Sequence, residues 1–168
     1  MEFKIKERIA FDVNLEESEY GRKKTIKFLR NLVKSSSIEN SESQWSSLDP
    51  YNDKNLNFKS MKYYPVFSAK SSDGRIMGAC ASELYQDGLI RVDLLAVDSK
   101  YKRQGVGLSL LKKIVDFARK NKIHNIQCLS PVLNKESKKF LKKAGFRKVG
   151  KLKKYFGKQD YYLWEYLP

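Results

Sequence analysis

The stretch YKRQGVGLSLL, residues 101–111, combines basic residues, a glutamine and two glycines with the start of an apolar helical pattern. The first backbone N–H groups of a helix have no partner within the helix, and the helix dipole adds partial positive charge there. Gly105 and Gly107 carry no Cβ and therefore let the backbone approach a ligand closely. With Lys102 and Arg103 beside them, the stretch predicts an anion site. It lacks the Gly-Lys-Ser/Thr ending of a P-loop and the third glycine of a dinucleotide fingerprint.

The other reactive side chains are few. Cys80 and Cys128 each stand inside an apolar run, which favours two buried thiols over a disulfide or a metal site. With His124 as the single histidine, the usual zinc constellations are missing, and no metal is expected. His124 stands at the start of a predicted strand, where a structural role is expected. Cys128 would need an activating base to act as a nucleophile, and the sequence places none.

Composition predicts one globular domain over residues 1–168. Hydrophobic residues make up 41% of the 168-residue chain and aromatic residues 12%, which is enough for one core. No apolar run approaches the roughly 20 residues that span a bilayer, and the N-terminus does not resemble a signal peptide. We therefore expect a cytoplasmic protein without membrane contact.

The net charge of +15 is distributed unevenly. Residues 1–98 carry 15 basic and 15 acidic side chains, whereas residues 99–158 carry 19 basic and 2 acidic ones. Charge of this kind maintains solubility in many proteins. It is also typical of a segment that contacts an anionic partner, either nucleic acid or a polyphosphate ligand.

The elements that must position these residues follow an α+β order. Alternation predicts strands at 3–11, 63–70, 75–86 and 89–97, with hairpin turns at SSDG and DG between the last three. Helical spacing predicts helices over about 14–34, 105–121 and 134–144, the first capped by Asn14. A buried strand at 122–130 and two final strands, 146–156 and 160–167, complete the chain. A long polar insertion lies at about 35–60 and has room for one more short helix near Trp45.

Two segments in this order resemble the GNAT superfamily of N-acetyltransferases. Its acyl-CoA pyrophosphate loop has a basic residue or glutamine followed at plus three and plus five by glycines, and Lys102, Gly105 and Gly107 fit that spacing. The segment NKESKKFLKKAGF is similar to a second family signature, in which an asparagine precedes Gly-Phe by eleven and twelve residues. Asn134, Gly145 and Phe146 occupy those positions. The resemblance covers residues 62–168 well and the first 61 in outline.

The resemblance implies a GNAT fold: a mixed, mostly antiparallel sheet of about seven strands with a splayed central pair, flanked by about four helices. It implies that acetyl-CoA is the cosubstrate. The pyrophosphate would meet backbone amides of the loop, and the pantetheine arm would run in the gap beside the strand that ends at Val97. The implied cosubstrate-binding residues are Leu95, Val97, Lys102, Arg103, Gln104, Gly105, Val106, Gly107, Leu108 and Asn134.

Family members often carry an acidic general base four residues before the end of the fourth strand, and here that residue is Asp93. It is a candidate to draw the amine proton through water, although a surface pair is an equally good explanation. Glu83 on the preceding strand is the weaker candidate. The tyrosine that usually serves as general acid is replaced by Leu141, so another group acts or coenzyme A leaves unassisted.

The implied activity is acetyl transfer from acetyl-CoA to a primary amine. The ending KLKKYFGKQDYYLWEYL is similar to that of ribosomal-protein and other protein N-terminal acetyltransferases, with Tyr155 and Phe156 in the place of a tyrosine pair. A peptide α-amine or lysine is therefore the first acceptor expected, and a small cationic amine the second. The alternative is a nucleic-acid- or ribosome-binding module with a vestigial acyl-CoA site, in which basic residues 99–158 contact RNA.

Overall fold

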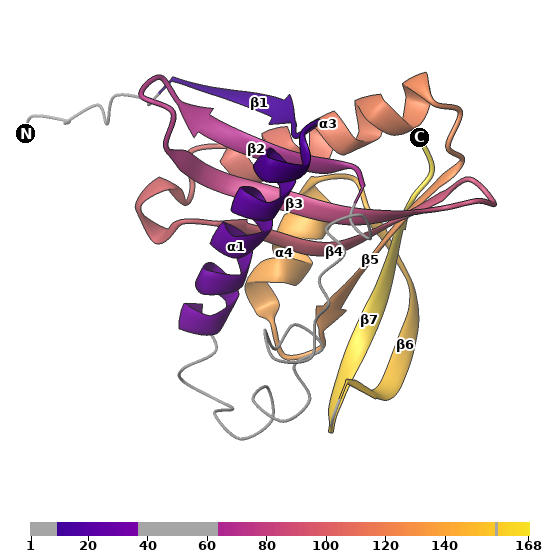
Figure 1. The fold of residues 1–168 in the computed structure, drawn as a ribbon. Helices are drawn as coiled ribbons and strands as arrows, with labels where there is room; N and C mark the ends of the chain where they lie inside the picture. Colours follow the sequence, from indigo (N-terminus) through magenta and orange to yellow (C-terminus); the bar gives the residue numbers. More distant parts are fainter. Residues whose placement is uncertain (1–9, 37–63, 157) are drawn as a thin grey trace, which may run out of the picture.

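Seven strands form one mixed sheet in the order β1-β2-β3-β4-β5-β7-β6 (Figure 1). The computed structural model describes residues 10–36, 64–156 and 158–168. Neighbouring strands are antiparallel except for β4 and β5, which run parallel. The strands are β1 Phe11–Leu15, β2 Val66–Ser71, β3 Ile76–Tyr85, β4 Leu89–Val97, β5 Asn125–Pro131, β6 Arg147–Phe156 and β7 Gln159–Tyr166. The helices are α1 Glu19–Ser36, the short 3-10 helix η2 Ser99–Tyr101, α3 Val106–Lys120 and α4 Lys135–Lys143.

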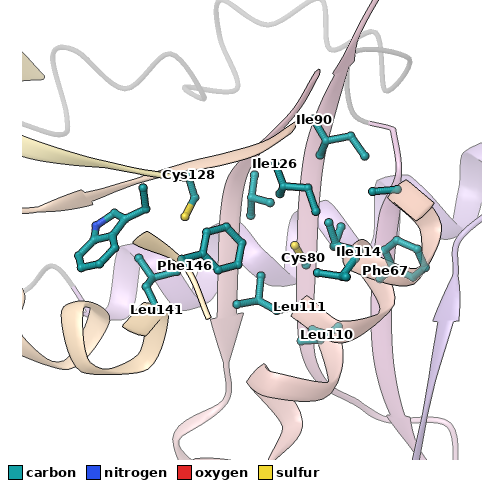
Figure 2. Close-up of a cluster of buried hydrophobic side chains, with 14 of the residues drawn as sticks. Phe67, Cys80, Ile90, Leu110, Leu111, Ile114, Ile126, Cys128, Leu141 and Phe146 are labelled. Atoms are coloured by element: carbon teal, nitrogen blue, oxygen red, sulfur yellow. The ribbon is translucent and has the colours of Figure 1, made fainter. Parts of the chain in front are cut away.

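The helices cover both faces of this sheet, with α1 on one face and α3 and α4 on the other (Figure 1). A small apolar cluster lies under α1 and contains Ile26, Leu29, Val66, Ala79 and Ala81. The larger cluster lies on the α3–α4 face, where Leu110, Leu111 and Ile114 of α3 pack on the sheet (Figure 2). The α+β fold with a seven-stranded sheet is thus confirmed. The described residues contain three α-helices and η2, and the expected helix near Trp45 lies outside them.

The central hairpins follow from their turns. Gly74 and Gly88 have φ near +80°, a conformation that glycine adopts without steric cost, and they close the β2–β3 and β3–β4 turns. Both hairpins were predicted from SSDG and DG. Helix α3 also matches its predicted limits, because its buried residues recur at helical intervals.

The predicted cap of the first helix was wrong. The strand that joins the sheet is Phe11–Leu15, which pairs with β2 and places Asn14 opposite Ser68. Residues 3–9 of the predicted strand lie outside the described residues. Because Asn14 belongs to β1, it cannot cap α1; Ser18 does so, and its Oγ accepts the Gly21 N–H at 3.0 Å. The FDVNL segment alternates apolar and polar residues, and that alternation continues the strand past the predicted cap.

The polar insertion predicted at about 35–60 overlaps the end of α1 at Ser36 and otherwise lies outside the described residues. In the part of the chain that the structure describes, no helix is long and apolar enough to cross a bilayer. The same residues contain no group of three or more acidic, histidine or cysteine side chains that could hold a metal ion.

Candidate functional site

Strands β4 and β5 separate halfway along their length. Their parallel pairing joins Leu89–Val92 to Asn125–Cys128 and stops there, although β4 continues to Val97 and β5 to Pro131. On its other side β4 stays paired with β3 as far as Val97. Leu95 and Val97 therefore lie on a stretch of β4 that has a strand neighbour on one side only. Backbone polar groups that face this split have no ladder partner from β5.

A β-bulge stands at the point where the split begins. Ser82 of β3 lies opposite Val92, and Ala81 lies opposite Leu94, so Asp93 is an extra residue without a partner in β3. A bulge bends its strand and redirects the side chain it carries. Asp93 is thus the first residue of β4 beyond the last β4–β5 pair.

The loop between β4 and α3 has an unusual backbone. Arg103 has φ +65° and Gly105 has φ +89°, two left-handed residues separated by Gln104. A left-handed backbone is uncommon in residues other than glycine. Where it does occur, it is often at a binding site. Gly105 is the N-cap of α3 and supplies no side-chain cap, so the first N–H groups of α3, from Val106 onward, receive no side-chain partner from it.

The side chains of this loop leave room for a ligand. A Cβ added to Gly105 would have no heavy atom within 4 Å, so the space in front of this residue is open. Gln104 donates from Nε2 to the Lys100 carbonyl at 3.1 Å, while its buried Oε1 has no partner among the described residues. Lys102 and Arg103 are exposed. The loop therefore combines open backbone donors, mobile positive charge and an unused acceptor.

Three elements converge beside this loop. A Cβ on Gly107 would lie 3.1 Å from Cε2 of Phe140 in α4 and 3.6 Å from Cγ2 of Val97. The missing Cβ thus permits the first turn of α3 to approach both α4 and the end of β4. The start of α3 and the split strand belong to one region of the molecule.

Asn134 is the N-cap of α4. Its Oδ1 accepts the Ser137 N–H at 2.9 Å, and its side chain is exposed. This capping role was not predicted. It leaves the amide Nδ2 of Asn134 without a partner among the described residues, on the α4 side of the molecule.

The two candidate carboxylates, Glu83 and Asp93, are joined by Arg91, which sequence reasoning missed. Arg91 Nε donates to Asp93 Oδ1 at 2.8 Å, and Nη2 donates to Glu83 Oε2 at 2.8 Å. Tyr85 donates its hydroxyl to the same Glu83 oxygen at 2.7 Å. The second oxygen of Asp93, Oδ2, is buried and has no partner within the described part of the chain.

A register argument could have found Arg91. The turn at Gly88 pairs Tyr85 with Leu89, and counting back along the hairpin puts Glu83 opposite Arg91. Residues two apart on a strand share a face, so Arg91 and Asp93 must be neighbours. Burial lowers the pKa of Arg91, but the hydrogen bond and charge of Asp93, with smaller contributions from Tyr85 and Tyr155, raise it above its usual value.

Tyr155 lies on the β6–β7 hairpin and makes a small contribution that raises the pKa of Arg91. Tyr155 is half exposed and stacks edge-on against the buried Tyr161, with ring centroids 6.0 Å apart. The tip of the hairpin is fixed by Asp160, which accepts the Lys154 N–H at 2.9 Å and pairs with Lys151 at 2.9 Å.

Leu141, which stands where a general acid was looked for, is a core residue. It is 6% exposed and belongs to the large cluster with Cys128 and Phe146 (Figure 2). Both cysteines are buried and free, as predicted. Burial raises the pKa of Cys80 to about 12 and also raises that of Cys128, so neither thiol is a ready nucleophile.

His124 and Glu16 have structural contacts. His124 lies against Gly88, where an added Cβ would come within 2.8 Å of its Nδ1. Glu16 is buried and accepts hydrogen bonds from Ser68 and from Lys70, the latter at 2.6 Å.

Comparison with known proteins agrees with this geometry. Residues 28–146 match the model of the acetyltransferase (GNAT) family. A search of curated proteins finds no match. Among solved structures the chain is similar to Ard1 from Thermoplasma volcanium, at 20% identity and a TM-score of 0.69 over 95% of this chain and 98% of that one. It is also similar to the ribosomal-protein-S18-alanine N-acetyltransferase from Escherichia coli, at 14% identity and a TM-score of 0.66 over 94% of each chain.

A third similar structure is a Bacillus anthracis protein described as a streptothricin acetyltransferase and solved with acetyl coenzyme A. The identity is 20%, the TM-score 0.57, and the match covers 61% of each chain. At these identities the structures establish the fold. The fold and the family match together define an acyl-CoA-dependent N-acyltransferase. The chain belongs to the acetyltransferase (GNAT) family.

Proposed function

We propose that this protein transfers the acetyl group of acetyl-CoA to a primary amine of a protein or peptide. The observation that carries the proposal is the split between β4 and β5, which opens beside the uncapped start of α3. An extended amide chain such as pantetheine can pair with the unpartnered edge of β4 as a missing strand would. A pyrophosphate suits the helix start, where backbone donors and the dipole favour negative charge.

The residues present fit that cosubstrate. Backbone amides from Arg103 to Leu108 would hold the pyrophosphate, with Gln104, Gly105, Val106 and Gly107 between them, and Lys102 would add charge. The backbone of Leu95 and Val97 would receive the pantetheine arm, and Nδ2 of Asn134 its distal part. The open space in front of Gly105 supports this assignment. When bound, acetyl-CoA supplies an acetyl thioester that a neutral amine can attack.

The proposed general base is Asp93, acting through water. Its position one residue beyond the last β4–β5 pair favours it over Glu83, whose Oε2 accepts hydrogen bonds from both Arg91 and Tyr85. With Leu141 buried in the core, we propose that coenzyme A leaves as its thiolate, without a side-chain acid at that position.

The proposed acceptor is a peptide α-amine or a lysine, with a small cationic amine as the remaining option. The support is the half-exposed Tyr155 on the β6–β7 hairpin, which packs edge-on against Tyr161 and offers a surface to an approaching peptide. The overall likeness to an N-terminal alanine acetyltransferase is consistent with this acceptor class.

Calorimetric titration with acetyl-CoA tests the cosubstrate site. We expect micromolar binding by the wild type and a loss of at least about tenfold in affinity for Gly105→Glu, because a carboxylate would occupy the anion site. Gly74→Glu is the matched control, since Gly74 also has a left-handed backbone, φ +80°, and open space around it. Equal affinity in Gly105→Glu and wild type would contradict the site.

Turnover tests the reaction itself. Release of free CoA is followed with three acceptors: a peptide that begins with alanine, a blocked peptide that contains lysine, and spermidine. Transfer to either peptide supports the proposal. Transfer to spermidine alone would show that the acceptor is a small cationic amine and not a peptide. Transfer to none of the three would overturn the proposed function.

A second candidate function is binding of RNA, and one observation favours it. The ammonium groups of Lys138 in α4 and Lys148 in β6 lie 5.7 Å and 4.5 Å from the centroid of the Tyr162 ring. Two like charges gathered on one ring are stabilised further by an anion. We define the α4–β6 lysine surface as Lys135, Lys138, Lys139, Lys142, Lys143, Lys148, Lys151, Lys153 and Lys154. Among the described residues, Lys151 is the member of this set that forms an ion pair within 4.0 Å, and its partner is Asp160.

Binding of a labelled 20-nucleotide poly-U RNA tests this surface. Phosphate contacts predict an affinity that falls steeply with salt, and the pair Lys138→Glu and Lys148→Glu should weaken it by at least about tenfold. The control pair is Lys24→Glu and Lys27→Glu on α1, which removes the same charge elsewhere. Equally tight binding of polyglutamate would indicate an acidic protein partner instead, and no binding of RNA would remove this candidate.

A further inference from the structure

The cluster of Glu83, Arg91 and Asp93 contains a residue whose role the proposed function leaves open. Arg91 uses both ends of its guanidinium: Nε contacts Asp93 Oδ1 and Nη2 contacts Glu83 Oε2, each at 2.8 Å. The three side chains are largely buried, with Asp93 12%, Glu83 10% and Arg91 32% exposed. Hydrogen bonds of this charge-assisted kind are short and directional.

Asp93 needs such a contact because its backbone is poorly restrained. It is the extra residue of the bulge, it has no partner in β3, and the pairing of β4 with β5 ends one residue before it. An aspartate has two side-chain torsions, and without a fixed partner it can point its carboxylate in several directions. The bond from Arg91 Nε occupies Oδ1 and leaves Oδ2 as the oxygen without a partner.

Arg91 is itself held from the other side. Glu83 Oε2 accepts from Arg91 and also from the Tyr85 hydroxyl, and the guanidinium carbon lies 5.3 Å from the centroid of the Tyr85 ring. The planar guanidinium can reach two carboxylates at once in a fixed geometry, whereas a lysine ammonium is a single point of charge. One cation between two carboxylates also leaves the cluster with a net negative charge, which suits an approaching ammonium.

We infer that Arg91 is a positioning residue that holds Asp93 Oδ2 toward the mouth of the β4–β5 split, with Glu83 and Tyr85 anchoring its guanidinium. The inference rests on the proposed function, in which Asp93 takes up the amine proton. It assigns Glu83 to the support of Arg91 and not to proton transfer. A purely structural ion pair would not couple Arg91 to the chemistry of Asp93.

A double-mutant cycle on turnover tests this role, using whichever of the three acceptors gives the highest rate. Asp93→Asn is expected to lower kcat about 100-fold, as loss of a general base does. Arg91→Met should lower kcat by about 10-fold to 100-fold and leave the acetyl-CoA Kd within about twofold. In the Arg91→Met background, adding Asp93→Asn should lower kcat by less than about threefold, because the base is already misplaced.

Two further variants separate position from charge and from folding. Arg91→Lys keeps the charge and should recover less than half of the lost kcat, because lysine cannot bridge both carboxylates. Arg75→Met is the matched control: Arg75 also binds an aspartate two residues away, Asp73, at 2.7 Å, in the exposed β2–β3 turn. Its kcat should equal that of the wild type.

The outcomes are distinguishable. Wild-type kcat in Arg91→Met, full recovery in Arg91→Lys, or multiplicative losses in the double variant would each overturn the role of Arg91. Wild-type kcat in Asp93→Asn would overturn both the base and its positioning residue, while transfer of acetyl groups would still support the proposed function. If no acceptor is acetylated, the proposed function fails and the inference fails with it.

Discussion

Trp164 Nε1 donates a hydrogen bond of 2.8 Å to Ser130 Oγ, and both side chains are 1% exposed. The bond joins β7 to the part of β5 that has already separated from β4. It therefore holds the far wall of the split in place while the near wall remains with β3. The width of the opening depends on both attachments.

This bond should be measurable as stability. Ser130→Ala leaves a buried indole N–H without a partner, which is expected to cost about 1–3 kcal/mol in the free energy of unfolding. In the background of Trp164→Phe the same change should cost less than about 0.5 kcal/mol, since the donor is gone. Urea unfolding of the four proteins gives the coupling, and equal costs in both backgrounds would show that the bond contributes nothing.

Glu16 gives a pH dependence with a defined sign. Burial raises its pKa, but hydrogen bonds from Lys70 and Ser68 outweigh burial and hold the pKa below the usual 4.5. The stabilisation is therefore present above about pH 4.5 and is lost as the pH falls through the lower pKa of the folded state. Glu16→Gln should lose about 1–2 kcal/mol at pH 7 and less at pH 3 by urea unfolding.

The neighbouring Glu17 provides the control for that experiment. It is exposed, so Glu17→Gln should change stability by less than about 0.5 kcal/mol at either pH. A Glu16→Gln penalty that stays constant from pH 7 to pH 3 would contradict the assignment of the stabilisation to an ionised, hydrogen-bonded carboxylate.

The buried cysteines should be silent in catalysis. Because burial raises the pKa of both thiols, a thiol reagent at pH 8 should label neither cysteine in the native protein and both after unfolding. Cys128→Ala should lose about 1 kcal/mol of stability and keep kcat within about twofold. A large fall in kcat, or an acetylated cysteine found by mass spectrometry, would indicate a covalent route instead.

Substitution of Asp160 should weaken binding of the acceptor and leave binding of acetyl-CoA unchanged. The hydrogen bond from the Lys154 N–H lowers the pKa of Asp160 most, and the hydrogen bond from Lys151 lowers it further. Asp160 is therefore ionised throughout the neutral range and keeps both contacts. Asp160→Ala frees the hairpin tip near Tyr155 and should raise the acceptor KM about threefold to tenfold, with the acetyl-CoA Kd unchanged. Asp160→Asn keeps an oxygen for the Lys154 N–H and should recover most of the loss. A shift in acetyl-CoA Kd would contradict this division.

The parts of the fold that depend on local signals were predictable. Helix α3 follows from the spacing of Leu110, Leu111 and Ile114, and the two central hairpins follow from glycines in their turns. The left-handed backbone at Gly105 is also a local property, which is why the loop was found first. The cap at Asn14 was wrong because residues 11–15 also alternate, and their pairing with the distant strand β2 places Asn14 in the sheet.

The candidate site was harder to predict from the sequence, because it depends on pairing between distant segments. The split of β4 from β5 was expected only from the family resemblance, since no local pattern marks where a parallel ladder ends. Asp93 was found without the bulge that isolates it, and Arg91 was missed because its role needs the register of the hairpin. The burial of Leu141 likewise depends on how α4 packs against β5, which no single segment specifies.

The two apolar clusters on opposite faces of the sheet have a consequence for how the sequence can diverge in evolution. Alanines line much of the α1 side, and the bulky side chains lie on the α3–α4 side. A substitution that changes how α1 packs against Ala79 or Ala81 alters the face of the sheet opposite α3. The packing under α1 can therefore change without disturbing the packing of α3 and α4 on the other face of the sheet.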